Sequence, residues 1–235
     1  MKAVVGPDTE QTIDLAAISL REFNGRLHAV GGEPGASQHW RVVNPGGLHA
    51  IAVGIDAPLE VDVEGHVGYY CAGMNQQATV RVHGNCGVGV AENMMSGKVV
   101  VHGNASQSAG ATAHGGLLVI GGDASARCGI SMKGVDIVVH GSVGHMSAFM
   151  AQSGCLVVGG DAGDALGDSI YEARLYVRGR VADLGADCVE KEMGGEHVAQ
   201  LESLLECGGL TDADPSQFRR YGSARRLYNF DVDHA

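Results

Sequence analysis

The sequence predicts an all-β protein: a single-stranded, right-handed parallel β-helix of about seven 19-residue coils, with an N-terminal cap and a C-terminal helical segment. Three observations carry this prediction. Aliphatic residues stand four and two positions before each of seven glycines. The apolar share is 45% but aromatics are only 5%, which suits a narrow core of small aliphatic side chains. A fixed repeat of this length is the signature of a solenoid, and here the glycines recur every 19 residues at Gly65, Gly84, Gly103, Gly122, Gly141, Gly160 and Gly179.

Residues 1–57 precede the repeat and form the predicted N-terminal cap segment. Within them, apolar spacing over residues 12–24 predicts a short helix that ends at Gly25. Two strand-like runs follow at 40–43 and 49–53, separated by a turn that contains Asn44. Because Gly46 also falls on the 19-residue grid, this region is expected to be either a degenerate first coil or a cap.

Residues 58–190 form the predicted β-helix. Alternate aliphatics before each glycine indicate a strand with one buried face, and stacked strands make equivalent positions direct neighbours. Small residues two and seven positions after each glycine indicate a tight inner layer. A right-handed coil is expected, as for parallel crossover connections in general. The glycines are then structural corner residues, which need either a positive φ or close backbone approach.

Residues 191–235 form the predicted C-terminal helix and docking tail. Residues 196–207 have helical spacing and are followed by two glycines as a stop. A second short helix is expected with Asp214 as its N-cap and Pro215 in its first position. Aromatic and arginine side chains are common interface anchors, so the tail is predicted to dock on a partner through Arg219, Arg220, Tyr221, Arg225, Arg226, Tyr228 and Phe230.

Charge and composition exclude several classes of protein. A net charge of −11 argues against a nucleic-acid binder. No apolar run approaches the roughly 18 residues that a membrane helix needs, and the first residues do not resemble a secretory signal. The six cysteines form no C-x-x-C pair, which is typical of reduced thiols, so a cytoplasmic location is expected.

Several residue groups could carry chemistry, but each has a structural interpretation that is favoured. His83, His102 and His140 share one position of the repeat and are expected to form an outward polar ladder. Cys71 and Cys128 share an offset but lie three coils apart, which excludes a common metal. A glycine-rich phosphate loop is a further candidate, but it would need a following helix. The last candidate is acid–base chemistry on a polysaccharide by carboxylates. These carboxylates are Asp123, Asp161, Asp164, Asp168 and Glu172. The sequence therefore predicts no catalytic, cofactor-binding or metal-binding residue in this chain.

The repeat resembles the GXGXG β-helix domain that ends the large subunit of glutamate synthase, and in particular stand-alone versions of it. Longer runs are similar to those of the stand-alone GXGXG subunit in the N-methylglutamate synthase family. These runs are GYYCAGM at 68–74, AENMMSG at 91–97, RCGISMKG at 127–134, AFMAQSG at 148–154 and LGDSIYE at 166–172. The region around Asn44 and 51–54 and the ending LYNF at 227–230 fit the same family.

The resemblance implies a non-catalytic scaffold subunit of a heteromeric enzyme. One implied partner resembles a glutamine amidotransferase, and the other an FMN-dependent glutamate-synthase-like subunit with an iron–sulfur cluster. FMN and the cluster are thus expected in a partner and not in this chain. Two alternatives stay open: the β-helix subunit of a formylmethanofuran-dehydrogenase-type complex, whose glycine repeat is similar, and an independent carbohydrate-active β-helix enzyme.

Overall fold

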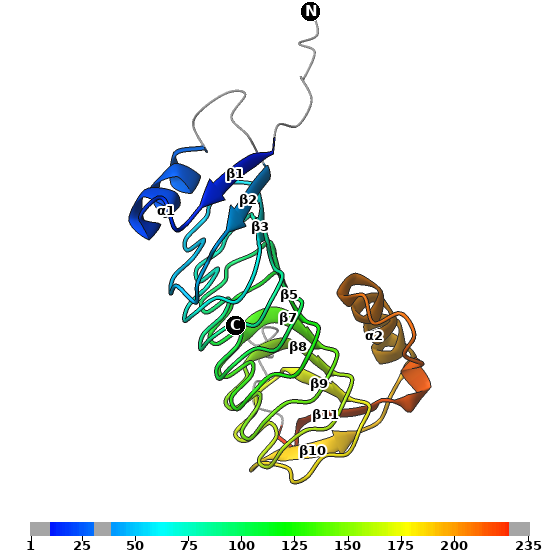
Figure 1. Ribbon diagram of the computed structural model, residues 1–235. Helices are drawn as coiled ribbons and strands as arrows, with labels where there is room; N and C mark the ends of the chain where they lie inside the picture. The colour runs from blue at the N-terminus through cyan, green and yellow to red at the C-terminus, as the bar shows by residue number, and fades with distance from the viewer. Residues whose placement is uncertain (1–9, 31–38, 226–235) are drawn as a thin grey trace, which may run out of the picture.

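The computed structural model describes residues 10–30 and 39–225, and it confirms a parallel β-solenoid of about seven turns (Figure 1). Eleven strands form one sheet in the order β1-β2-β3-β4-β5-β6-β7-β8-β9-β11-β10. The strands are β1 (Gln11–Asp14), β2 (His39–Val43), β3 (Glu60–Val63), β4 (Thr79–Val82), β5 (Lys98–Val101), β6 (Leu117–Ile120), β7 (Lys133–Val139), β8 (Ser153–Val158), β9 (Arg174–Val177), β10 (Cys188–Lys191) and β11 (Arg219–Ser223). The helices are α1 (Leu20–Ala29), α2 (Gly195–Gly208) and the 3₁₀ helix η2 (Pro215–Gln217).

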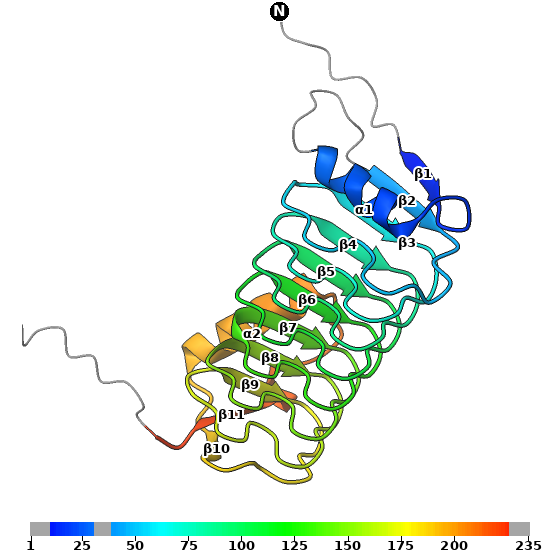
Figure 2. The ribbon, with the colours of Figure 1, turned by 90° about the vertical axis from the view of Figure 1, so that its left-hand side faces the viewer.

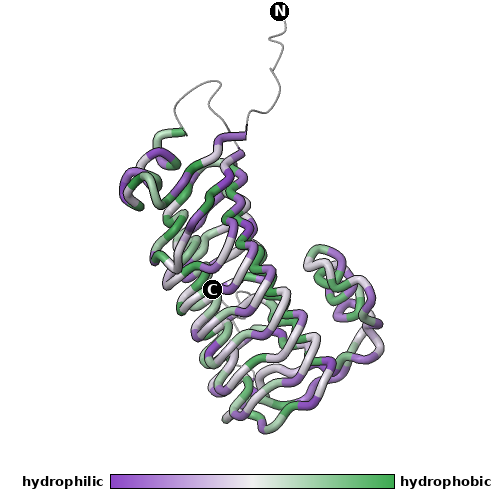
Figure 3. Tube along the Cα trace, viewed as in Figure 1, coloured by the Kyte–Doolittle hydropathy of each residue, from purple (hydrophilic) through white to green (hydrophobic). Residues whose placement is uncertain are grey.

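The strands β3 to β9 stack in the register that the glycine period predicts (Figure 2). Val61 pairs with Val80, and this pairing continues at each 19-residue step as far as Leu156 with Leu175. A second ladder of single bridges joins the small residues that follow each glycine, from Val67 and Cys86 on to Val181. Hydrophobic stretches therefore recur in successive coils (Figure 3), and their buried side chains form one mainly aliphatic core.

The corner glycines allow successive backbones to approach closely. The amide of Gly103 donates to the carbonyl oxygen of Gly84 at 3.0 Å, and the same bond recurs at each later corner. A Cβ on Gly84 would lie 2.6 Å from the carbonyl oxygen of Gly65, which is too close for any side chain. Among the seven, however, only Gly65 has a positive φ. The sequence predicted either a positive φ or close backbone approach at these glycines. Close backbone approach is the reason that applies throughout the repeat.

The left-handed backbone recurs instead in the turns five, seven and nine residues after each corner from Gly65 to Gly160. Tyr70, Ala72 and Met74 have φ of 60°, 54° and 56°, and equivalent residues of the following coils share this conformation. Many are not glycine, although a left-handed conformation costs such residues roughly 1 kcal/mol each. The bonds between coils hold this conformation: the amide of Tyr70 donates to Val88 and the amide of Met74 donates to Glu92, both at 2.8 Å.

The N-terminal segment extends the solenoid. Strand β2 pairs in parallel with β3, and β1 pairs in parallel with β2. Two predictions for this segment were wrong. The helix begins later than expected, with Ser19 as its N-cap, and Gly25 lies inside it. Residues 49–53 form turns, not a strand, because Ala50 and Ala52 have a positive φ.

The C-terminal segment folds back onto the sheet. The predicted helix is confirmed as α2, and Gly209, with a φ of 72°, is its C-cap. The second helix is confirmed as η2, where Asp214 accepts a hydrogen bond from the amide of Ser216 at 2.8 Å. The sheet continues across residues 57 and 190, after which the sequence predicted segment boundaries. These boundaries and the right hand of the coil stay predictions.

Helix α2 covers the outer face of β6, β7 and β8 (Figures 1 and 2). A second hydrophobic cluster lies between helix and sheet, and it includes Val138, Val157 and Tyr176 on the sheet and Leu201 and Leu205 on the helix. The strands were predicted to have one buried face, but under α2 their outer face is buried as well, at Val138, Val157 and Tyr176. Within the described residues, no helix is long and apolar enough to cross a membrane.

Candidate functional site

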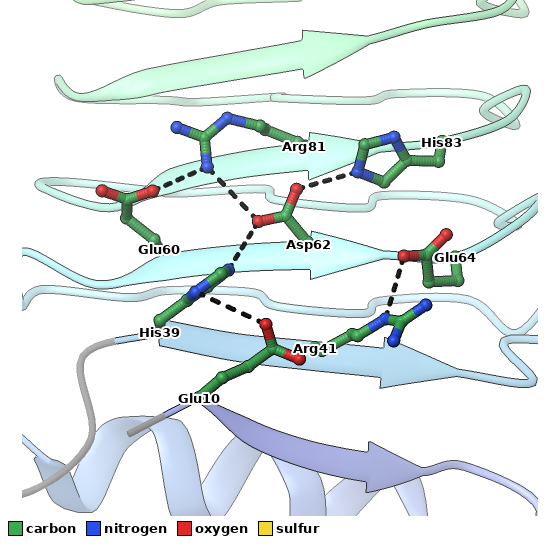
Figure 4. Close-up of polar contacts among 8 residues, drawn as sticks. All are labelled: Glu10, His39, Arg41, Glu60, Asp62, Glu64, Arg81 and His83. Atoms are coloured by element: carbon green, nitrogen blue, oxygen red, sulfur yellow. Dashed lines mark hydrogen bonds and ion pairs between the residues drawn. The ribbon is translucent and has the colours of Figure 1, made fainter. Parts of the chain in front are cut away.

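A group of charged residues occupies the outer face of the first strands and is called here the Asp62 network (Figure 4). The residues lie on β2, β3 and β4 or directly after β3 and β4, and Glu10 lies just before β1. They share the sheet face that α2 covers further along the solenoid. Alternation places them there because every second residue of a strand points away from the core. The members are Glu10, His39, Arg41, Glu60, Asp62, Glu64, Arg81 and His83.

Asp62 is the centre of this network. Its carboxylate contacts His39 Nε2 at 2.9 Å, His83 Nε2 at 2.8 Å and Arg81 Nη1 at 3.3 Å. Arg81 also donates to Glu60 at 2.8 Å. These contacts link three adjacent coils, because His39, Asp62 and Arg81 belong to β2, β3 and β4.

The contacts shift the pKa of two members of the network, Asp62 and Arg81. Burial by itself raises the pKa of Asp62, but hydrogen bonds from His83 and His39 and the positive charge of Arg81 outweigh it, so the pKa lies below 3.8. The pKa of Arg81 is raised, mainly by its hydrogen bond to Glu60. Burial acts in the opposite direction, and the negative charge of Asp62 adds to the effect of Glu60. The hydrogen bonds and ion pairs of this network therefore join adjacent coils, and its carboxylates and arginines are engaged with one another.

A second polar ladder follows the corner glycines and uses the side chain just after each one. Asn85 Oδ1 accepts the amide of Asn104 at 2.8 Å, and Asn104 Oδ1 accepts the amide of Asp123 at 2.8 Å. Asp123 and Asp161 continue the ladder by accepting the amides of Ser142 and Arg180, both at 2.7 Å. Asp123 and Asp161, two of the five carboxylates considered for acid–base chemistry, thus bind backbone of the next coil.

The histidine ladder divides between two roles. His83 and His102 stack with ring centroids 4.7 Å apart, as expected for equivalent residues of adjacent coils. His140 instead contacts the carbonyl oxygen of Gly208, at the end of α2, at 2.8 Å. Among the described residues no group of three or more His, Cys, Asp or Glu side chains is arranged to hold a metal ion.

The cysteines are mostly core residues. Cys71 and Cys128 are fully buried, and Cys207 is exposed. Burial raises the pKa of Cys128 to about 12. For Cys155, burial followed by the negative charge of Asp136 raises the pKa to about 12. Such thiols stay protonated near neutral pH, so these two are poor metal ligands and poor nucleophiles.

The predicted docking residues contact their own chain where the structure describes them. Strand β11 pairs antiparallel with β9 and with β10, and Tyr221 is buried in the core. Arg220 donates to the carbonyl oxygen of Glu192 at 2.9 Å, and Arg219 donates to that of Gly179 at 3.3 Å. These residues belong to a strand inserted between β9 and β10, so the described part of the predicted docking tail is extended and lies on its own sheet. Contact with a partner stays a prediction, and Arg226, Tyr228 and Phe230 lie outside the described residues.

One surface feature was missed from the sequence and is called here the N-terminal apolar patch. Five of the seven large hydrophobic side chains that are exposed in the described residues come from the first coils: Leu48, Tyr69, Tyr70, Met74 and Met95. Tyr69 stacks on His49 at 4.5 Å and meets Tyr70 edge-on at 6.4 Å. The signal was the pair Tyr69-Tyr70 in a chain with few aromatics, but only the turn geometry shows that both rings face outward.

Comparison with known proteins shows a relative that matches nearly the whole chain. No family model matches the chain. Protein GlxC of Rhizobium meliloti (strain 1021) is 65% identical to it over 224 residues, which are 95% of this chain and 97% of that protein. The chain belongs to the GlxC family. With nearly the whole length matched, the GlxC likeness extends well beyond the repeated glycines to the cap segment and to α2.

Proposed function

We propose that this GlxC-family chain is the structural scaffold subunit of a glutamate-synthase-like complex, most specifically N-methylglutamate synthase. That enzyme converts methylamine and glutamate into N-methylglutamate and ammonia. In this proposal the scaffold holds a glutamine-amidotransferase-like subunit and an FMN-dependent glutamate-synthase-like subunit in a hetero-oligomer. FMN and an iron–sulfur cluster belong to the latter subunit. The proposal rests on the family resemblance of the long sequence runs and includes a cytoplasmic location.

The observation that carries a scaffold role is the use of the polar side chains. Asp62, Asp123, Asp161 and His140 are the chain's most plausible chemical groups, and each binds a neighbouring coil or α2. A site for catalysis needs groups that are free to meet a substrate. A solenoid whose coils are linked by backbone, glycine and side-chain ladders is instead suited to hold other subunits at fixed separation.

The N-terminal apolar patch supports contact with a catalytic subunit. Tyrosine and methionine are enriched at protein interfaces, where they fill pockets of the partner. Tyr69 and Tyr70 are each 49% exposed and Met74 is 51% exposed. The rings of His49 and Tyr69 are stacked on each other, so they lose little freedom when a partner binds.

Purification of the native complex tests the proposal. The chain, tagged at its N-terminus and expressed in its own cells, should bring down an amidotransferase-like and an FMN-dependent synthase-like chain, identified by mass spectrometry. The complex should show a flavin spectrum that the isolated chain lacks. Stoichiometric FMN on the isolated chain, or methylamine transfer by it alone, would contradict the proposal. Molybdenum- or tungsten-type dehydrogenase partners would instead favour the formylmethanofuran alternative.

A further inference from the structure

The tyrosine rings of the N-terminal apolar patch lie over two glycines of the next coil. A Cβ on Gly87 would be 2.9 Å from Tyr69 Cδ1, and a Cβ on Gly89 would be 2.7 Å from Tyr70 Cδ1. The two glycines therefore leave the room that the rings occupy. Each tyrosine is nevertheless 49% exposed, so the rings rest on the solenoid and still leave much of their surface open to a partner.

A carboxylate lies beside the second tyrosine. The same Cβ on Gly89 would be 2.8 Å from Glu92 Oε2, so this oxygen and the ring of Tyr70 are neighbours. Backbone hydrogen bonds hold Glu92 in place. Its amide donates to the carbonyl oxygen of Gly89 at 3.1 Å, and its carbonyl oxygen accepts the amide of Met74 at 2.8 Å. Glu92 therefore lies next to two members of the apolar patch, Tyr70 and Met74.

The carboxylate of Glu92 has no counter-charge in the described part of the chain. No hydrogen bond or ion pair joins it to any residue of 10–30 or 39–225. Three donors, in contrast, contact the carboxylate of Asp62. Glu92 is half-buried, and a charge that loses part of its hydration is stabilised by a partner of opposite sign. A cation from another molecule would complete the pair.

We infer that Glu92 and Tyr70 together bind an arginine side chain of a proposed catalytic subunit. This inference rests on the proposed function and names the group that the N-terminal apolar patch receives. The guanidinium group has paired donors that fit a carboxylate and a flat face that stacks on an aromatic ring. A cation over a tyrosine ring is also attracted by the ring itself.

Arginine suits this position better than other cations. The ammonium group of lysine is compact, strongly hydrated and unable to stack, and lysine is depleted at protein interfaces where arginine is enriched. The apolar side chains of Tyr69 and Met74 can cover the methylene groups of an arginine. The net charge of −11 favours a partner with a basic surface, and a second copy of this chain would bring the same negative charge.

Affinity measurements on a charge variant test the inference. The full-length chain is mixed with the purified proposed catalytic subunits, and binding is measured by analytical ultracentrifugation at about 50 mM and about 500 mM salt. Glu92→Gln should weaken binding about tenfold at the lower salt and much less at the higher salt, because salt screens the pair. Glu206→Gln, an exposed carboxylate on α2, is the control that should bind normally. Both variants should melt within about 2 °C of the parent chain.

Two substitutions at Tyr70 separate the aromatic ring from its apolar surface. Tyr70→Phe keeps the ring, whereas Tyr70→Leu keeps only apolar contact. Tyr70→Phe should bind within about twofold of the parent chain, and Tyr70→Leu should lose about fivefold. Equal affinities of these two variants would overturn the inference, because no guanidinium group would then stack on the ring.

Chemical modification identifies the arginine itself. Phenylglyoxal reacts with guanidinium groups, and peptide mass spectrometry locates the modified residues. One arginine of a catalytic subunit should be protected in the complex and modified in the separated subunit. Glu92→Arg should abolish binding, and changing the protected arginine to glutamate should then restore affinity about tenfold.

The outcomes separate this inference from the proposed function. Equal affinities of the parent chain and Glu92→Gln would overturn the inference and leave the proposed function intact. Self-association of the isolated chain that Glu92→Gln abolishes would assign the site to a second copy and overturn the inference as well. If neither proposed subunit bound the parent chain, the proposed function would fail and this inference with it.

Discussion

His140 Nε2 on the sheet contacts the carbonyl oxygen of Gly208, the last residue of α2, at 2.8 Å. Lys98 Nζ contacts the carbonyl oxygen of Cys207, one residue earlier, at 3.1 Å. The last carbonyl groups of a helix have no partner within it and carry partial negative charge. The solenoid thus provides the donors that α2 lacks at its C-terminus, and this fixes where the helix ends on the sheet.

Packing beneath α2 is expected to hold the helix more strongly than these two contacts. Leu201 is fully buried between the helix and the sheet. Leu201→Ala should cost about 2–4 kcal/mol, and it should release α2 before the solenoid unfolds. Hydrogen exchange would then be faster in residues 195–208 than in β3 to β8. The exposed neighbour Glu202 provides the control, since Glu202→Ala should leave exchange in α2 nearly unchanged.

The corner glycines are expected to be sensitive to a single methyl group. In Gly84→Ala the new Cβ would meet the backbone of Gly65 and His66, which cannot rotate away. A loss of about 1–3 kcal/mol in the free energy of unfolding is expected, measured by urea denaturation.

Gly25→Ala is the matched control for this substitution. Gly25 lies inside α1 and has open space around its Cβ position, so the change should stabilise by about 0.5–1 kcal/mol. Similar effects at the two positions would refute the role assigned to the stacked corners.

Acid should weaken the Asp62 network. Because the pKa of Asp62 is lower in the folded chain than its ordinary value of 3.8, the carboxylate contributes stability above that pH. This contribution is lost as the pH falls through the lower pKa of the folded state. Asp62→Asn should therefore cost about 1–2 kcal/mol at pH 7 and flatten the decline of stability between pH 5 and pH 2.

The control for the acid effect is Glu206→Gln, an exposed carboxylate on α2. It should change neither the stability at pH 7 nor the shape of the acid profile by a measurable amount. Thermal melting in a series of buffers gives both profiles. If Asp62→Asn had the same acid profile as the parent chain, the pairing of Asp62 with His39 and His83 would not contribute to stability.

The N-terminal apolar patch is expected to contribute to assembly and not to folding. Met74 and Met95 are 51% and 47% exposed, so a double change to Gln should leave the melting temperature within about 2 °C. Affinity for the proposed catalytic subunits should fall about tenfold, measured by analytical ultracentrifugation. Met150→Gln, at 38% exposure, four coils from Met74 and three from Met95, is the control that should bind normally. Equal affinities for all variants would place the interface elsewhere.

Much of the solenoid could be predicted because its repeat is free of insertions. The period that joins Gly65 to Gly84 also sets the pairing of Val61 with Val80, so one observation in the sequence determines the register of seven strands. Local signals were equally clear at Gly209, which ends α2, and at Asp214, which caps η2.

The parts that could not be predicted depend on contacts between distant residues. Positive φ at Tyr70 and Met74 is imposed by neighbouring coils and has no signal in the residue types. The outward Val138 and Val157 become buried only because α2 returns to cover them. Tyr221 is of a residue type that is common at protein interfaces, but here it is buried against the sheet of its own chain.

The central claim is that this chain connects the catalytic subunits and does no chemistry itself. The most direct measurement is an omission experiment with the two proposed catalytic subunits, purified with FMN and iron–sulfur cluster in place. Light scattering reports assembly, and formation of N-methylglutamate from methylamine and glutamate reports activity. The account predicts that both subunits stay separate and inactive until this chain is added. Full assembly and activity without it would contradict the account.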